Sequence, residues 1–317
     1  MRWGFTLFDR FGNLDLVYRD PAINSCYPLP VRPRKRPPPF PAQVAWEGNQ
    51  EGEILLLDIY RGLEWIPRGT VRRLRIVGVP AKTHPTMNYP SMGVTGDDPG
   101  KFVIGTAPVE PDGSAYFRVP SGVPFFVQAL DADGLAVQVM RSATYLPPGK
   151  KFTCIGCHEP RNMAPPNVPA IAARREPSRL TPGPEGSWPL DFQVLVQPVL
   201  DKHCLACHKP GAKDAEHDLT PGKAYDTLVN YGKPSLRQHV LERYVKVTPS
   251  RGPCAAQESA LLKLLKQGHY EVKLRDDDQE RLVTWIDTYG QRRGAFSPAQ
   301  EDDLRELRRR MASLLEK

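Results

Sequence analysis

Phe192-Gln-Val-Leu-Val-Gln-Pro-Val-Leu-Asp-Lys-His203 leads directly into Cys204-Leu-Ala-Cys207-His208, and this stretch decides what kind of domain closes the chain. Apolar residues recur at helical spacing over Phe192–His203, which predicts a helix. Two cysteines separated by two residues follow, with a histidine directly after them. Thiols at this spacing can bond the two vinyl groups of one porphyrin, and the next imidazole then faces the iron. The stretch therefore predicts a helical domain that carries a covalently attached c-type haem.

A second copy of the pattern, Cys154-Ile-Gly-Cys157-His158, stands at the end of a β-like segment. Cys-x-x-Cys pairs also occur in redox dithiols and in zinc sites. Zinc ribbons place their second pair about 15–20 residues after the first, whereas Cys157 and Cys204 are 47 positions apart. A dithiol requires no histidine. We therefore expect two haems, attached through Cys154, Cys157, Cys204 and Cys207, with His158 and His208 on the iron atoms; zinc or disulfides at both motifs remain the alternative.

The iron at the second motif needs a ligand on its other face. Because no methionine lies between Met163 and Met311, the candidates are His217, His239 and His269. We favour His269, which lies in the loop before a helix predicted for Asp276–Tyr289. Two histidine ligands are typical of a low-potential haem that relays electrons.

For the first haem, the candidate ligands opposite the motif histidine are His84, Met87, Met92, Met140 and Met163. Three of them lie in one proline-rich loop, for which packing against the β domain is the simpler interpretation. An iron without a second protein ligand keeps an open position, and chemistry can occur there. A catalytic role for the first haem therefore stays open.

Alternating apolar residues before the first motif indicate strands, with Asp112-Gly113 and Asp133-Gly134 as turns between some of them. The predicted strands cover Glu53–Tyr60, Thr70–Val77, Phe102–Ala107, Ala115–Val119, Phe125–Ala129 and Leu135–Met140. The fold class predicted is thus α+β and multidomain. An antiparallel β-sandwich-like domain is followed by an α-helical domain like that of class I cytochromes c.

The 34 prolines among 317 residues are about twice the average usage and cluster between the predicted domains. We expect a hairpin at 1–20, a Pro-rich linker at 21–50, a β-rich middle domain with the first motif at 51–163, a second linker at 164–188, the cytochrome c-like domain at 189–295 and a charged, solvated helix at 296–317. A lone hairpin is marginal in water, so the first one is expected to complete a larger sheet. Cys26 and Cys254 either pair or remain thiols.

Charge and hydropathy exclude several classes of partner. The 43 basic and 36 acidic residues give a net charge of +7, but no basic block is interleaved with aromatic residues, so nucleic acid is not an expected partner. No segment approaches the roughly 18 apolar residues that span a bilayer. The chain begins without a signal peptide, although haem attachment of this kind takes place outside the cytoplasm.

In its motifs, the chain resembles the C-terminal part of the hydrazine synthase alpha subunit and its relatives in planctomycetes and similar bacteria. The matching segments are Phe8–Asn13, Val17–Asp20, Ile59–Gly62, Val109–Pro120, Met140–Ser142, Cys154–Pro160, Cys204–His208, Gly268–His269 and Leu282–Asp287. The resemblance implies a β-propeller, a β middle domain with one haem, and a cytochrome c domain with a bis-histidine haem. His208 and His269 suit that last role.

The resemblance also implies a periplasmic or otherwise extracytoplasmic protein with a redox partner protein or another subunit. The export signal and most of the propeller would then be missing from an N-terminally truncated chain. In the family the first haem is catalytic and bound by a tyrosine shortly after the motif, and Glu159–Met163 contains none. We therefore predict a dihaem electron-transfer protein rather than a true hydrazine synthase. The alternative is a haem-dependent oxidoreductase that acts on small nitrogen compounds at the first haem.

Overall fold

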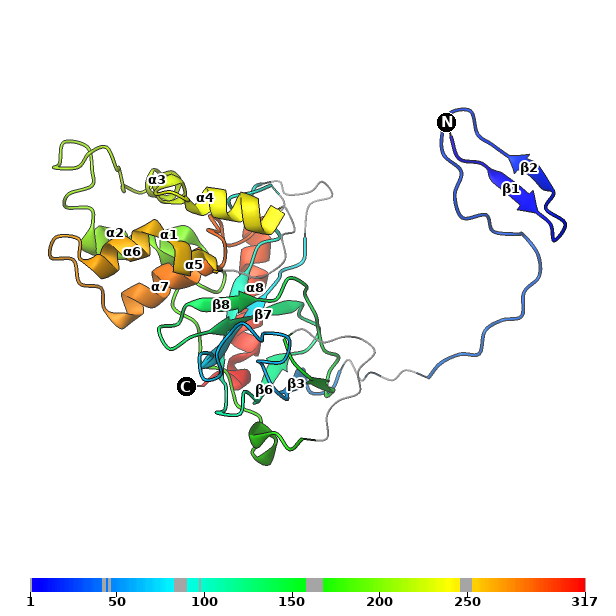
Figure 1. Cartoon of the computed structure of the whole chain (residues 1–317), viewed down its shortest axis with the longest axis horizontal. Coiled ribbons are helices and arrows are strands. Elements are labelled where there is room, and N and C mark those ends of the chain that lie inside the picture. The colour runs from blue at the N-terminus through cyan, green and yellow to red at the C-terminus, as the bar shows by residue number, and fades with distance from the viewer. Residues whose placement is uncertain are drawn as a thin grey trace. The chain divides into compact units, whose positions relative to one another are not determined.

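The computed structural model describes residues 2–41, 44, 47–82, 90–96, 98–157, 168–245 and 253–316, with the backbone alone at 243–245. The chain divides into two compact units, Met1–Gln43 and Val44–Lys317 (Figure 1). None of the helices in these described ranges combines the length and the apolar character that a bilayer span requires.

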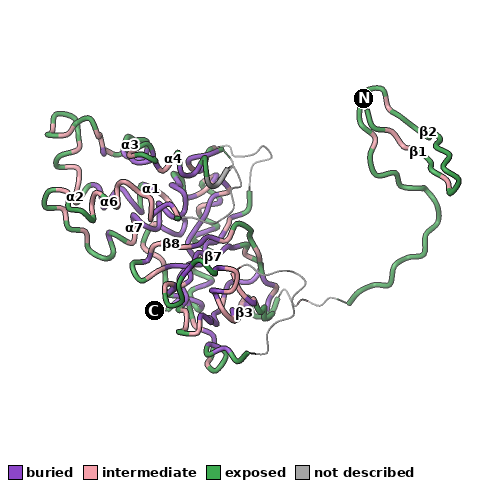
Figure 2. The backbone as a smooth tube through the Cα atoms, viewed as in Figure 1, coloured by how far each residue is buried: buried purple, intermediate pink, exposed green. Residues whose placement is uncertain are grey.

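The first unit contains the hairpin that the sequence predicts. Strands β1 (Phe5–Phe8) and β2 (Leu14–Tyr18) pair antiparallel. The Asp9 carboxylate accepts the backbone N–H groups of Phe11 and Asn13 at 2.8 and 3.0 Å, which closes the turn. Most of the unit is exposed (Figure 2). Its exposed apolar side chains include Leu7, Phe8, Leu14, Leu16 and Val17.

The second unit is built on two sheets. One has the strand order β6-β3-β9 and the other β5-β4-β7-β8. Their strands are β3 (Glu51–Leu56), β4 (Arg73–Gly78), β5 (Phe102–Pro108), β6 (Ala115–Pro120), β7 (Phe125–Leu130), β8 (Ala136–Val139) and β9 (Lys151–Cys154). The four-stranded sheet is antiparallel, as predicted. In the other sheet, β3 and β6 also pair antiparallel as predicted, but β9, which is not among the predicted strands, runs parallel to β3. A long connection precedes β9, and such a connection lets an edge strand run in either direction.

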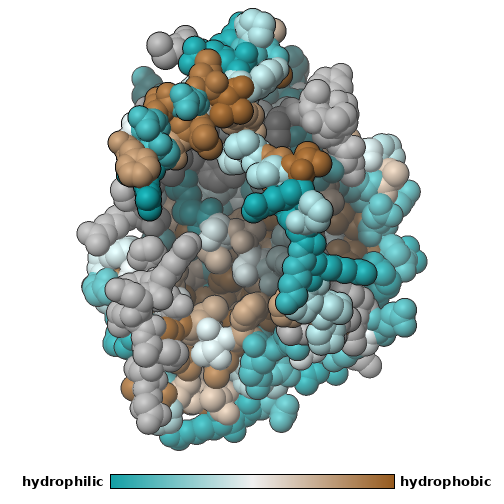
Figure 3. Space-filling view, turned by 90° about the vertical axis from the view of Figure 1, so that its right-hand side faces the viewer, coloured by the Kyte–Doolittle hydropathy of each residue, from teal (hydrophilic) through white to brown (hydrophobic). Residues whose placement is uncertain are grey.

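The four-stranded sheet is the middle layer of this unit, and both of its faces are covered. Successive residues of a strand point to opposite faces. On one face, side chains such as Ile76 and Phe125 pack against the three-stranded sheet. On the other face, Val103 and Phe126 pack against the helices. A space-filling view of one side of the whole molecule shows hydrophobic residues gathered in several places among hydrophilic ones (Figure 3).

The helices lie beside this sheet (Figure 1). They are η1 (Ile171–Arg174), α1 (Phe192–Leu195), α2 (Gln197–His203), α3 (Ala224–Asn230), α4 (Leu236–His239) with the π-helical turn η2 (Val240–Val245), α5 (Ala255–Glu258), α6 (Ala260–Gln267), α7 (Asp276–Asp287), α8 (Pro298–Arg310) and η3 (Ala312–Leu314). The helix predicted for Phe192–His203 is divided near Val196, because Pro198 has no N–H to donate to Val194. The Val194 carbonyl instead accepts a hydrogen bond from Arg281 at 3.1 Å.

An aromatic cluster joins α1, α3 and α7. The rings of Phe192 and Trp285 meet edge to face, with 5.2 Å between their centres, and Tyr225 lies 5.4 Å from Phe192. The Trp285 indole N–H donates to the carbonyl of Gln291 at 2.8 Å, and the Tyr225 hydroxyl donates to that of Gly290 at 2.8 Å. These hydrogen bonds satisfy the polar ends of two buried rings, so the cluster fixes how the three helices cross.

The last helix is not the solvated appendage that its composition predicts. Leu304, Met311 and Leu314 are buried in the core between the two sheets. The end of the chain also pairs with the second linker, where the N–H of Leu180 donates to Leu314 at 2.8 Å. The many Arg and Glu side chains of α8 lie on its outer face. They dominate the composition of the helix, so composition alone does not reveal this apolar stripe.

Asp278 fastens the end of α2 to the start of α7. Its carboxylate accepts Lys202 Nζ at 2.7 Å and His203 Nε2 at 2.9 Å. The hydrogen bond from Lys202, followed by that from His203, lowers the pKa of Asp278 below its ordinary value of 3.8. A lowered folded-state pKa gives stability that is present above the unfolded value and lost as the pH falls through the folded one.

Asp278→Asn is therefore expected to lower the free energy of unfolding by about 1–2 kcal/mol at pH 7. The loss should shrink as the pH falls below about 4, because the unfolded wild-type chain, in which Asp278 has its ordinary pKa, then takes up a proton that the folded chain does not. Urea denaturation at a series of pH values from 7 to 3 measures both effects. A loss that stays constant over this range would show that the charge of Asp278 does not contribute.

Candidate functional site

The second motif forms a tight turn at the end of α2. The N–H of Cys204 donates to Leu200 at 2.8 Å, which ends the helix. The N–H groups of Cys207 and His208 both donate to the carbonyl of Cys204 at 3.1 Å. Cys204 is half-buried against the helical core, and Cys207 is exposed. One turn of chain thus presents both thiols and the histidine together.

Burial, and then the neighbouring thiol, raises the pKa of Cys204 to about 11, and the same causes raise that of Cys157 to about 11. A redox dithiol works through a thiolate, and its attacking cysteine has a lowered pKa. The environment of the two motifs therefore does not favour the dithiol interpretation.

His208 has two further imidazoles close to it. The ring centre of His269 lies 5.9 Å away, and the two rings are nearly parallel, with 26° between their planes. The ring of His217 lies 6.3 Å away at 79°. The structure thus brings together two of the three candidate ligands with the motif histidine. The third, His239, is buried and bonds through Nδ1 to Glu258 at 2.7 Å.

His269 reaches this place because α6 ends directly before it. Gly268 adopts a φ of 94°, a left-handed conformation that favours glycine and that turns the chain out of the helix. The following Tyr270 lies under the ammonium group of Lys213, 4.3 Å from the ring centre. The loop that carries His269 therefore contacts the loop that follows the second motif.

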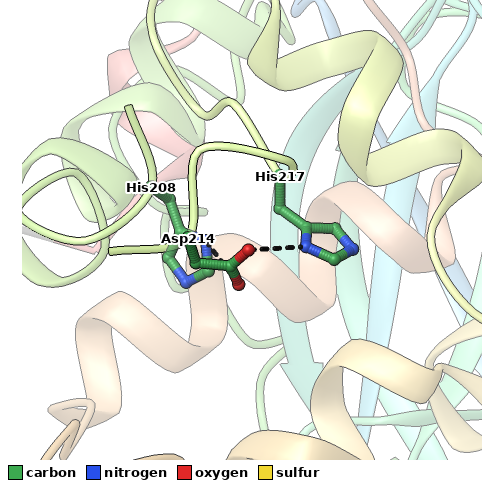
Figure 4. Close-up of side chains that lie close together, drawn as sticks. All are labelled: His208, Asp214 and His217. Carbon is green, nitrogen blue, oxygen red and sulfur yellow. Dashed lines mark hydrogen bonds and ion pairs between the residues drawn. The ribbon is translucent and has the colours of Figure 1, made fainter. Parts of the chain in front are cut away.

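Asp214 is a residue of this site that the sequence analysis did not single out. Figure 4 shows its carboxylate between the rings of His208 and His217. Oδ2 lies 3.5 Å from Nδ1 of His208, and Oδ1 lies 3.3 Å from Nδ1 of His217. Asp214-x-x-His217 is the only signal in the sequence, and it is weak without knowledge of how the loop returns to His208.

The distance between the ring centres of His208 and His269 suits two imidazoles that share one metal ion. An imidazole nitrogen binds a metal at about 2 Å, so two rings on opposite sides of one ion have their centres about 6 Å apart. The observed 5.9 Å agrees with this value. With both thiols on the adjoining turn, the residues present fit a c-type haem with two axial histidines.

The first motif follows β9. Cys154 lies opposite Leu56 of β3, and its carbonyl accepts the N–H of Leu57 at 2.9 Å. The N–H of Cys157 donates to the Arg61 carbonyl at 3.1 Å. A Cβ at Gly156 would lie 2.5 Å from that carbonyl oxygen, so only glycine fits at this position. The turn is thereby pressed against the Ile59–Gly62 segment.

His158, the expected ligand of the first iron, lies outside the described residues, as do His84, Met87 and Met163. Met92 is fully buried, and Met140 packs against the helical core. The thiols of the first motif pack instead against the core between the sheets. Packing therefore accounts for both methionines that the structure describes among these candidates.

The comparisons with known proteins agree with this architecture. The sequence model of the hydrazine synthase alpha subunit middle domain matches residues 69–159, which hold β4 to β9 and the first motif. A structure of Kuenenia stuttgartiensis hydrazine synthase superposes with a TM-score of 0.52 at 19% identity, over 80% of this chain and 44% of that chain. A search of curated protein sequences found no match.

The structural likeness covers far more than the matched segment, so the shared fold extends beyond the middle domain. At the same time, this chain spans less than half of the hydrazine synthase chain that it matches. The family resemblance expected from the motifs is confirmed. This chain is related to the hydrazine synthase alpha subunit, and its residues 69–159 match the sequence model of that subunit's middle domain.

Proposed function

We propose that this chain is a dihaem c-type cytochrome-like protein that transfers electrons. The observation that carries the proposal is the distance of 5.9 Å between the ring centres of His208 and His269. Both rings lie beside the turn that presents Cys204 and Cys207. A bound haem would supply a one-electron iron couple at this place.

In this proposal the chain's own residues attach and orient the haem. Cys204 and Cys207 would form the two thioethers, and His208 and His269 would hold the iron. With two protein ligands such an iron would supply electron relay rather than substrate chemistry. The aromatic cluster around Trp285 keeps α1 and α7 crossed next to the motif. The partner is a redox protein or another subunit, and the location is extracytoplasmic, where such haems are attached.

A second function, redox chemistry on small nitrogen compounds at the first haem, is supported by the family match, which ends directly after Cys157 and His158. It requires an open position on that iron. Its sign is a five-coordinate, high-spin spectrum that shifts when hydroxylamine or nitric oxide is added. Two six-coordinate haems would exclude this function.

A divalent metal ion is the rival occupant at the second motif. Ligand atoms of His208, Asp214 and His217 lie within 4.8 Å of one another, and two histidines with one carboxylate form a recognised iron(II) or zinc ligand set. This alternative predicts a colourless protein that binds zinc. The metal would be lost on substitution of His217, whereas the haem would not.

The proposal is tested on protein exported to a periplasm that has cytochrome c maturation machinery. The pyridine haemochrome spectrum and the intact mass should show two haems. Replacing both Cys154 and Cys157 with alanine should remove one haem, and replacing both Cys204 and Cys207 should remove the other. Cys254→Ala is the matched control and should retain both. A colourless wild-type protein would contradict the proposal.

A further inference from the structure

We propose that Asp214 is a positioning residue for His208. Its carboxylate accepts a hydrogen bond from the Nδ1–H of His208 and thereby stabilises the ferric state of the second haem. This inference rests on the proposed function. It adds the group that sets the Fe(II)/Fe(III) equilibrium of the second haem.

The Nδ1 atom of His208 needs a partner. It is buried, and it forms no hydrogen bond within the described residues. The nearest acceptor recorded for it is the Oδ2 atom of Asp214 at 3.5 Å, just beyond hydrogen-bond length. Histidines that bind a metal almost always donate their other ring N–H to a carboxylate, a backbone carbonyl or water. A small rotation of either side chain completes this bond.

The backbone holds Asp214 next to this nitrogen. Its own N–H donates to the carbonyl of Cys207 at 2.9 Å, and the N–H of Leu219 donates to that of His208 at 2.9 Å. The loop between these two bonds therefore returns twice to the motif. The Oδ1 atom of Asp214 lies 3.3 Å from Nδ1 of His217, which leaves Oδ2 directed at His208 (Figure 4).

A carboxylate acceptor makes the imidazole a stronger donor to iron, because it draws the ring proton away and adds a negative charge behind the ligand. Both effects favour Fe(III) over Fe(II). The Asp214 side chain is 42% exposed, so water weakens the charge effect. The hydrogen bond to His208 requires that the carboxylate touch the ring, whereas a negative charge acts from any position on the loop. A second acidic residue of the same loop therefore serves as the control for charge alone.

The test compares Asp214→Asn with Glu216→Gln in the full chain loaded with both haems. Glu216 is an exposed residue of the same loop, and its substitution removes the same charge. Potentiometric titration of Asp214→Asn should show the Fe(II)/Fe(III) equilibrium of the second haem shifted about tenfold toward Fe(II), which equals about 59 mV for one electron. Glu216→Gln should shift it several times less, and Asp214→Glu should restore most of the wild-type balance.

A second readout reports the bond directly. The paramagnetically shifted NMR signal of the His208 Nδ1–H should move in Asp214→Asn and stay in Glu216→Gln. Equal potentials in all variants, or equal shifts in Asp214→Asn and Glu216→Gln, would overturn the role of Asp214. Absence of the second haem from the wild-type protein would instead overturn the proposed function, and haem content is measured first.

Discussion

His269→Ala is expected to convert the second haem from a six-coordinate, low-spin centre into a five-coordinate, high-spin one, with the haem still attached. In the proposed function, attachment depends on thioethers to Cys204 and Cys207, which the substitution does not touch. Axial ligation depends on the imidazole whose centre lies 5.9 Å from that of His208. Absorption and electron paramagnetic resonance spectra measure the spin state, and intact mass measures attachment.

His217→Ala is the matched control, because its ring is almost as close to His208, at 6.3 Å. An axial pair must reach the iron from opposite faces of the porphyrin. His217 belongs to the loop that is bonded back to Cys207 and His208, and its Nδ1 faces Asp214. Because this loop starts and returns at the turn that carries His208, we expect His217 to stay on the His208 side of a bound haem. We expect the His217→Ala protein to remain low-spin, and a high-spin haem in this variant alone would assign the ligand to His217.

The sequence predicts what is local in this structure and misses what depends on distant contacts. Turns such as Asp112-Gly113 and alternating strands are local, and the strands of the antiparallel sheet are found where they are expected. The spacing of Cys204, Cys207 and His208 is local too. The pairing of β9 with β3 is not, because nothing within Lys151–Cys154 states which edge it joins or in which direction.

The candidate site shows the same division. The sequence offers three histidines as ligands of the second iron and favours His269, and the structure brings His217 and His269 close to the motif histidine. His239 is buried and hydrogen-bonded to Glu258, so it does not lie beside the motif as a ligand would. Asp214 gives no sequence signal stronger than its spacing to His217, since its position beside His208 comes from backbone hydrogen bonds of the loop. For the first motif, His158 lies outside the described residues and stays a prediction.

Asp287, near the end of α7, joins the helices to the central sheet. It is buried where the helices meet the central sheet, and burial raises the pKa of its carboxyl group to about 6 against the opposing effect of Arg75. Oδ2 accepts the N–H of Ala136 in β8 at 2.8 Å, and Oδ1 accepts that of Ala256 in α5 at 2.9 Å. Arg75 of β4 lies 3.9 Å away. One carboxylate thus joins two helices to two strands.

Asp287→Ala is expected to lower the free energy of unfolding by about 3–5 kcal/mol, because it leaves a buried guanidinium without its carboxylate and two buried N–H groups without an acceptor. Urea denaturation followed by circular dichroism measures the loss. Asp287→Asn retains one oxygen as an acceptor and should lose less than the alanine variant. Asp277→Ala, an exposed acidic residue of the same helix, should cost less than about 1 kcal/mol.

The contacts of Asp287 lie between the helices and the central sheet, so its loss should weaken this boundary. Arg75 also donates to Gln128 at 2.9 Å, and Gln128 donates in turn to the carbonyl of Asp287 at 2.7 Å. Loss of the carboxylate therefore weakens the seam between helices and sheet while both cores keep their apolar contacts. Arg75→Met in the Asp287→Ala background should recover part of the lost stability, since it removes the unpaired charge. If the double variant is less stable than Asp287→Ala, the charge of Arg75 is satisfied elsewhere, and the seam is held by packing alone.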